Sequence, residues 1–290
     1  MQSFKRYSIL AGAVLGLGTL AFADTVVVSP GDMGSWSFNQ QDGNTGLVCP
    51  ANVCGTGSMV YGPATPPLGV GSANLQTALN QGQDLSSIVS TALNGVSLSS
   101  LTALSYSTYD TLNNGSQFPF MELMISDTAG DSNYGPDIAD KIFFEPPYQT
   151  PGSGNPSLPN QGLPVMDQWQ TWNALSGGWW DDNGICNQGA GAGGVCSLAT
   201  LIAAIPGATI VPDLNGDGGV HLTVGDASSG ENFNGYVDNV TFGVNGTDTT
   251  YDMEPVGPVP EPGTFVLFTG AGLIVFAYSR RKAKMQKQTL

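Results

Sequence analysis

Residues 104–109 read Leu104-Ser105-Tyr106-Ser107-Thr108-Tyr109, a run in which apolar side chains alternate with polar ones. Successive side chains of a β-strand point to opposite faces, so this alternation predicts a strand with one face in a core. Similar short runs rich in Val, Ile, Thr, Tyr and Phe recur along the chain, separated by turn-forming clusters of Gly, Asn, Asp and Pro. The predicted strands are 25–28, 72–77, 103–109, 118–126, 141–145, 165–169, 209–211, 220–224, 236–244 and 249–253.

Two segments are predicted to be helical. Residues 79–93 carry apolar side chains at helical spacing, although Gly82 weakens the pattern. Residues 197–205 read SLATLIAAI, a short helix that starts at a Ser cap and ends at Pro206. Ten short strands with turn signals and one or two short helices predict an all-β fold, a β-sandwich.

The charge of the chain is strongly acidic and unevenly distributed. The 290 residues include 23 acids, 8 bases and one His, and the net charge is −15. All the acids lie between Asp24 and Glu261, where Lys141 is the only base, so 24–262 carries −22. This balance excludes a nucleic-acid partner, because phosphates are bound by Lys and Arg. It suits divalent cations and neutral or weakly charged polymers.

The N-terminus predicts a secretory signal peptide. Lys5 and Arg6 precede an apolar run at 9–20, and Ala21-Phe22-Ala23 supplies small residues at the two positions that signal peptidase reads. We therefore expect signal peptidase to cleave after Ala23 and the remaining chain to be exported.

The C-terminus combines three elements. Pro260-Glu261-Pro262 is followed by an apolar run at 265–278 and then by a basic cluster that begins at Arg280-Arg281. The apolar run predicts a short transmembrane helix, and the basic cluster holds the tail on the cytoplasmic side. An ordinary single-span anchor is the alternative interpretation.

This tail resembles the PEP-CTERM sorting signal of Gram-negative bacteria. The resemblance implies that a membrane protease-transpeptidase, exosortase, recognises Pro260, Glu261 and Pro262 together with the basic cluster at Arg280 and Arg281. It also implies a precursor anchored in the inner membrane, then a cell surface or extracellular matrix location linked to exopolysaccharide and biofilm. The expected organisation is a signal peptide (1–23), an exported β-sandwich domain (24–255), a Pro-rich sorting motif (256–264), a transmembrane helix (265–279) and a basic cytoplasmic tail (280–290).

The exported body is similar to secreted bacterial proteins of unknown activity that are built as lectin-like jelly rolls. The similarity is carried by 101–106, 168–172, 178–180, 235–243 and 251–255. It implies a jelly-roll or lectin-like sandwich. It implies little about function, because sandwich folds host many unrelated activities.

The four cysteines fall into two close pairs, Cys49 with Cys54 and Cys186 with Cys196. Four cysteines allow three pairings, and we expect the local one, because each pair brackets a Gly- and Asn-rich loop. An even number of cysteines also fits an oxidising compartment. A metal site with His221 is the weaker alternative, since that His stands alone.

Asp213, Asn215 and Asp217, followed by Gly218, match the first half of a calcium-binding loop. The twelfth position is Val224 instead of Glu, so the segment is not an EF-hand. A tight turn between the strands 209–211 and 220–224 uses the same residue types and is the competing interpretation. A structural calcium ion is therefore a candidate cofactor.

Four tryptophans lie within twelve residues, and the last two precede acidic residues in Trp179-Trp180-Asp181-Asp182. A sugar ring stacks on an aromatic ring while carboxylates bond its hydroxyls, so these four residues are glycan-binding candidates. Only one of the two neighbouring tryptophans can face a ligand from a strand, and core packing is the alternative for either.

No pair of carboxylates, nucleophile elbow or phosphate-binding loop stands out, so the sequence favours a non-enzymatic protein. We expect an exported surface or matrix protein that associates with exopolysaccharide or another glycan. The alternatives are a carbohydrate-active hydrolase or lyase on the same fold and a purely structural matrix protein.

Overall fold

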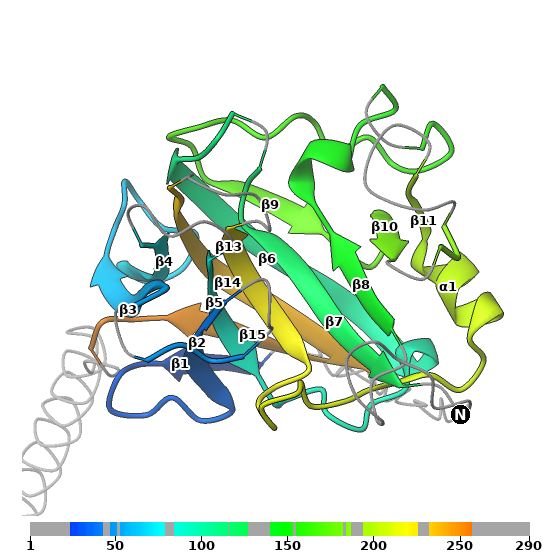
Figure 1. Cartoon of the computed structure of the whole chain (residues 1–290), viewed down its shortest axis with the longest axis horizontal. Helices are drawn as coiled ribbons and strands as arrows, with labels where there is room; N and C mark the ends of the chain where they lie inside the picture. The colour runs from blue at the N-terminus through cyan, green and yellow to red at the C-terminus, as the bar shows by residue number, and fades with distance from the viewer. Residues whose placement is uncertain are drawn as a thin grey trace, which may run out of the picture.

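The computed structural model describes residues 24–42, 47–50, 53–78, 84–115, 117–126, 140–152, 155–181, 184–186, 194–225 and 232–256. These residues form two β-sheets that lie face to face, with β7 and β13 crossing in front of β6 and β14 in Figure 1. The predicted β-sandwich is thereby confirmed. The predicted signal peptide and the predicted transmembrane helix at 265–279 lie outside the described residues. Within the described ranges, no helix is both long and apolar enough to cross a membrane.

One sheet has seven strands. Its path is β1-β15-β14-β4-β3, and β6 pairs with both β14 and β9. Strands β1 and β15 run parallel, whereas the other neighbours in this sheet are antiparallel. The strands are β1 (Asp24–Val28), β3 (Gly55–Tyr61), β4 (Gly71–Thr77), β6 (Leu101–Leu112), β9 (Gln170–Asn173), β14 (Asn234–Val244) and β15 (Thr247–Met253).

The other sheet has eight strands in the order β11-β10-β8-β7-β13-β5-β2, with β12 paired to β7. The strands are β2 (Trp36–Asp42), β5 (Asp84–Ser90), β7 (Phe120–Ser126), β8 (Asp140–Phe144), β10 (Gly178–Asp181), β11 (Cys196–Ser197), β12 (Thr209–Ile210) and β13 (Val220–Gly225). Three short helices complete the described elements: η1 (Leu98–Ser100), η2 (Pro146–Tyr148) and α1 (Leu198–Ala204).

The core lies between the two sheets. Aromatic contacts cross this layer: Tyr106 of β6 meets Phe144 of β8 edge-on at 5.9 Å, and Trp36 of β2 stacks on Phe242 of β14 at 5.7 Å. All four side chains are buried. Burying a large apolar side chain stabilises a fold by about 1.5–3 kcal/mol, so these contacts hold the two sheets together.

Two local features of the sequence determine the structure around them. Asn245 and Gly246 join β14 to β15 with φ values of +52° and +82°, the positive values that a two-residue hairpin of type I′ requires. The predicted helix at 197–205 is confirmed as α1, because the side chain of Ser197 caps its N-terminus by accepting from the N–H of Thr200.

Two other predictions are wrong. The predicted helix at 79–93 contains β5, which pairs with β13 on one side and with β2 on the other. Hydrogen bonding to two neighbours outweighs the helical spacing of its apolar residues. The predicted strand at 165–169 is also incorrect: Asp167 has φ +58°, outside the range of a strand, and β9 begins only at Gln170.

Candidate functional site

The outer face of the eight-stranded sheet carries a row of four chemically distinctive residues. In the strand register, Trp180 of β10 pairs with Phe143 of β8, Phe143 with Glu122 of β7, and Glu122 with His221 of β13. Partners in register point to the same face of a sheet, so the four side chains lie side by side. We call this set the Trp180–His221 row.

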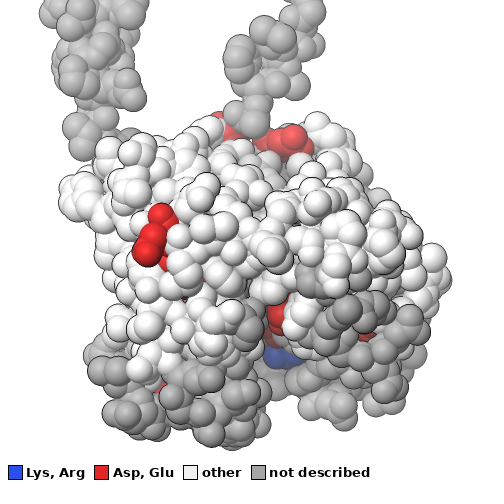
Figure 2. All heavy atoms as spheres, turned by 90° about the horizontal axis from the view of Figure 1, so that it is seen from above, with Lys and Arg blue, Asp and Glu red and all other residues white. Residues whose placement is uncertain are grey.

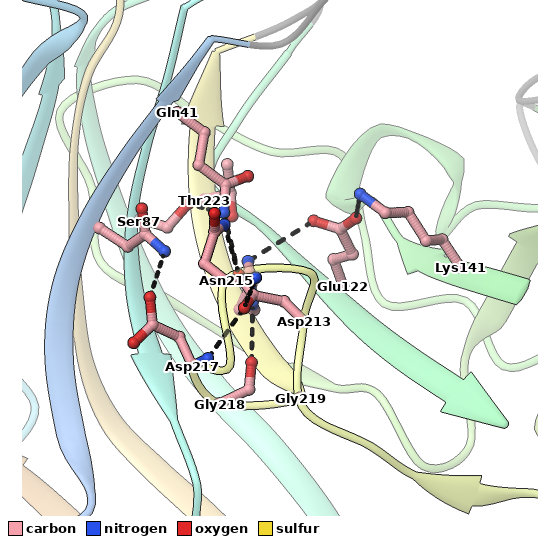
Figure 3. Close-up of polar contacts among 12 residues, drawn as sticks. Gln41, Ser87, Glu122, Lys141, Asp213, Asn215, Asp217, Gly218, Gly219 and Thr223 are labelled. Carbon is pink, nitrogen blue, oxygen red and sulfur yellow. Dashed lines mark hydrogen bonds and ion pairs between the residues drawn. The ribbon is translucent and has the colours of Figure 1, made fainter. Parts of the chain in front are cut away.

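Glu122 lies at the centre of the row and is buried. Its Oε1 lies 2.8 Å from the Nζ of Lys141, and its Oε2 lies 3.9 Å from the Nδ1 of His221 (Figure 3). The alternation in Met121-Glu122-Leu123-Met124 predicts that Glu122 faces solvent, and this prediction is wrong. Strand β7 is buried on both faces from Phe120 to Ile125. The carboxylate of Glu122 is therefore buried and contacts polar side chains instead of solvent.

The loop that leads into β13 covers the His221 end of the row. The Nε2 of His221 lies 2.8 Å from the carbonyl oxygen of Gly218, and Asn39 of β2 donates to Asp217 at 2.9 Å. Gln41 of β2 donates to Asp213 at 3.1 Å. Figure 3 shows this loop lying over the strands that carry Ser87 and Thr223. These hydrogen bonds hold the loop against the sheet. They also fix the position of His221 at this end of the row.

The calcium candidates lie in the same loop. Asp213 Oδ1 accepts from the backbone N–H groups of Asn215 and Asp217, each at 2.9 Å, and its Oδ2 accepts from Gln41. Among the described residues no group of three or more His, Cys, Asp or Glu side chains is arranged to hold a metal ion. These hydrogen bonds of Asp213 are those of a tight turn, and the calcium site stays a prediction.

The opposite end of the row is aromatic. Trp180 is half-buried and stacks on Phe143 with a centroid separation of 4.1 Å and an interplanar angle of 14°. The indole N–H of Trp180 is buried without a hydrogen-bond partner. Lys141 is the only Lys or Arg among the described residues, so it is the blue group that Figure 2 shows in a hollow of the surface beside red carboxylate atoms. An aromatic platform and a charged pair therefore adjoin at this end.

The other glycan candidates do not form part of this platform. Trp179 is fully buried, lies 5.7 Å from Phe144 and donates to the carbonyl of Ala174 at 2.8 Å, so it is a core residue. Asp181 is buried too, and its carboxylate accepts from the N–H groups of Ile185 and Cys186 at 2.8 and 2.7 Å. The glycan-binding predictions for Trp179 and Asp181 are wrong, because both side chains are used inside the fold. Asp182 lies outside the described residues.

Both disulfides join cysteines that are close in sequence, as predicted: Cys49 with Cys54 and Cys186 with Cys196. Two disulfides are consistent with an extracellular location. The signal-cleavage residues Ala21 and Ala23 and the sorting residues Pro260, Glu261, Pro262, Arg280 and Arg281 lie outside the described residues.

A separate acidic cluster lies at the end of β15, distant in sequence from the row. Asp238 accepts from the N–H groups of Leu68 and Met253, and Glu254 accepts from those of Val70 and Gly71. Burial raises the pKa of Asp238 to about 6. Burial and the carboxylates of Asp238 and Glu254 raise the pKa of Asp252 from 3.8 to about 7.

This cluster makes stability depend on pH. Because the folded protein binds these protons more tightly than the unfolded chain, stability falls as pH rises from about 4 to about 7. Asp252→Asn removes one of the repelling charges, so we expect a stability gain on the order of 1 kcal/mol at pH 7.5 and a flatter pH profile. Urea unfolding at pH 4.5 and 7.5 measures both. Asp248→Asn, at an exposed carboxylate of β15, is the control and should change neither. A wild-type protein that becomes more stable between these two pH values would contradict the prediction.

The sequence predicts only part of the row. Trp180 is a glycan-binding candidate and His221 a weak metal-ligand candidate, whereas Phe143 and Glu122 are not candidates, and Lys141 stands out by its charge alone. One signal was available: Lys141 is the only base among the 23 acids of residues 24–262, so a carboxylate partner for it is expected. The partner itself depends on strand register, which the sequence does not specify.

Comparisons with known proteins give little further information. No protein-family model and no curated protein matches the chain. A solved structure, the family 11 carbohydrate-binding module of the cellulosomal cellulase Lic26A-Cel5E of Clostridium thermocellum, is similar with 12% sequence identity and a TM-score of 0.33. The match covers 72% of this chain and 88% of that module.

Proposed function

We propose that this protein is a non-catalytic glycan-binding β-sandwich, with Trp180 and Phe143 as the stacking platform and Lys141, held in place by the buried Glu122, as the hydrogen-bonding group beside it. The observation that carries the proposal is the half-buried Trp180 ring stacked on Phe143 at 4.1 Å, at the edge of a charged pair. The C–H face of a sugar can lie on such a ring, while the ammonium group bonds its hydroxyls.

The charge of the exported body supports a neutral glycan. Residues 24–262 hold 23 acids and a single Lys, so an anionic polysaccharide would meet repulsion on most faces. Catalysis is not part of the proposal, because the carboxylates nearest His221, those of Glu122 and Asp213, are buried and already hydrogen-bonded or ion-paired.

Export and sorting complete the proposal. The body, 24–255, would be a jelly-roll or lectin-like domain. Signal peptidase would release it after Ala23, and an exosortase-type enzyme would process the tail near Pro260-Glu261-Pro262. The support is the sequence alone. The leader has a basic start, an apolar run and small residues at the cleavage site, and the tail has Pro-Glu-Pro, an apolar run and a basic cluster. Placement at the cell surface or in the matrix would bring the body to exopolysaccharide. The intact mass of the exported protein tests both cleavages.

Glycan binding is tested by substituting Trp180. We expect the exported protein to bind neutral oligosaccharides on a glycan array, with or without added calcium, and Trp180→Ala to weaken that binding about tenfold or more. Loss of one stacking contact corresponds to about 1.4 kcal/mol, or a factor of ten.

Tyr61→Ala is the matched control, since Tyr61 is also aromatic, is 67% exposed and lies on β3 of the other sheet. Its binding should equal that of the wild type. Wild-type affinity in a folded Trp180→Ala variant, or no binding by the wild type to any glycan, would refute the proposal.

A further inference from the structure

A charge-free apolar surface lies where the chain leaves the sandwich after β15. Its exposed members are Tyr61 at the end of β3, Val70 just before β4 and Val256, the last described residue, which are 67%, 57% and 45% exposed. The loop between β3 and β4, 62–70, reads GPATPPLGV and holds no acid or base, in a body that carries −22 over 24–262. We call Tyr61, Val70 and Val256 the exit patch.

Contacts between the β3–β4 hairpin and the segment after β15 hold the parts of this patch together. Tyr61 pairs with Gly71 in the strand register. The N–H of Val70 donates to the carboxylate of Glu254 at 2.6 Å. Gly71 lies directly against Pro255, since a Cβ on Gly71 would be 2.2 Å from the Pro255 ring. The exit patch is therefore one surface, built from two segments that lie far apart in sequence.

The tail that follows keeps this patch close to a bilayer. Phe265, the first residue of the predicted transmembrane helix, comes nine residues after Val256, so even a fully extended chain places it within about 30 Å of Val256. A short tether of this kind gives the body a high local concentration at the membrane surface. Because Val256 is itself part of the exit patch, this is the face that the tether holds nearest to the membrane.

The chemistry of the exit patch suits the headgroup region of a bilayer. Tyrosine is enriched there, because its ring is apolar and its hydroxyl is polar. Glu254 lies under the patch, is buried and accepts from the N–H groups of Val70 and Gly71. Burial and the acidic neighbours of Asp252 raise its pKa to about 7, so this carboxylate is partly neutral at neutral pH. The acidic body as a whole repels anionic lipids, so we expect contact with zwitterionic lipid.

We propose that the exit patch is a membrane-contact surface, through which Tyr61, Val70 and Val256 seat the folded body on the headgroup region of a zwitterionic bilayer. The proposal rests on the transmembrane helix predicted for the tail. It adds that the body of the anchored precursor lies against the membrane in one orientation, instead of only being attached to it. The exit patch shares no residue with the glycan platform.

Site-directed fluorescence tests the proposal on the exported chain with its tail intact, reconstituted into phosphatidylcholine vesicles. All four cysteines are in disulfides, so a single added cysteine can be labelled with the dye NBD. We expect a nitroxide in the lipid headgroup region to quench about half of the emission from Tyr61→Cys and from Val70→Cys, as for side chains that sit in the interface. Thr247→Cys is the control and should not be quenched, because Thr247 is exposed and lies at the start of β15, about 20 Å from Met253 along the strand.

Flotation of the vesicles on a density gradient separates the anchor from the contact. A chain that does not float with the vesicles overturns both. A chain that floats, but is quenched no more at positions 61 and 70 than at position 247, overturns the contact alone.

A charge placed in the patch gives an independent test. Val70→Asp, combined with the label at Tyr61→Cys, should reduce quenching at position 61 to the level at position 247, whereas Thr247→Asp should leave it unchanged. Quenching at position 61 that survives Val70→Asp overturns the proposal. So does a blue shift of the dye that follows protein concentration without nitroxide quenching, because a second copy of the chain would then cover the patch.

Discussion

Trp179→Ala is expected to lower the free energy of unfolding by about 3–5 kcal/mol, the range for removing a buried aromatic side chain. Trp179 is fully buried, contacts the ring of Phe144 and satisfies its N–H with the carbonyl of Ala174. The substitution leaves a cavity beside Phe144 and an unpaired carbonyl. Urea unfolding followed by circular dichroism measures the change, since it reports the loss of sheet structure directly.

Its neighbour supplies the control. Trp180 lies on the opposite face of β10 and is half-buried, so Trp180→Ala should cost about 1 kcal/mol or less in stability while weakening the proposed glycan binding. The folded fraction of Trp179→Ala should bind glycans as the wild type does. Equal destabilisation by the two substitutions would contradict the placement of the two rings on opposite faces.

The parts of the fold that the sequence predicts are those that local chemistry determines. Ser197 caps α1 with its own hydroxyl. The disulfides close short loops. The sequence predicts a helix in place of strand β5, because its apolar residues Leu85, Ile88 and Val89 also match helical spacing. Its identity as a strand comes from β13 and β2, which lie far away in sequence.

The candidate site divides in the same way. The sequence predicts that only one of Trp179 and Trp180 can face a ligand, but not which one. The structure shows that Trp179 points into the core and Trp180 points to the outer face of the sheet. The arrangement of Phe143, Glu122 and His221 beside it could not be predicted, because it depends on the register of four strands spread over residues 120–225. A one-residue slip in any of them would move its side chain to the other face.

Glu122→Ala is expected to be nearly as destabilising as the loss of Trp179, by about 3 kcal/mol, because it removes one partner of a largely buried ion pair. Lys141 loses a 2.8 Å contact, and His221 loses a carboxylate 3.9 Å away. Urea unfolding again measures the effect. A loss of this size would mean that the Glu122 carboxylate stabilises the sheet next to the aromatic platform.

The pair Glu122→Met with Lys141→Met separates charge from packing. If the cost of Glu122→Ala comes from disturbing the ion pair, removing both charges together while keeping side-chain volume should recover most of the lost stability. Asp248→Asn, at an exposed position on β15, should have no effect on unfolding. A double variant as unstable as Glu122→Ala would instead mean that His221 and the loop over it depend on the Glu122 carboxylate itself. In that case the platform is supported by the hydrogen-bonded network around His221 and not by the Lys141 pair.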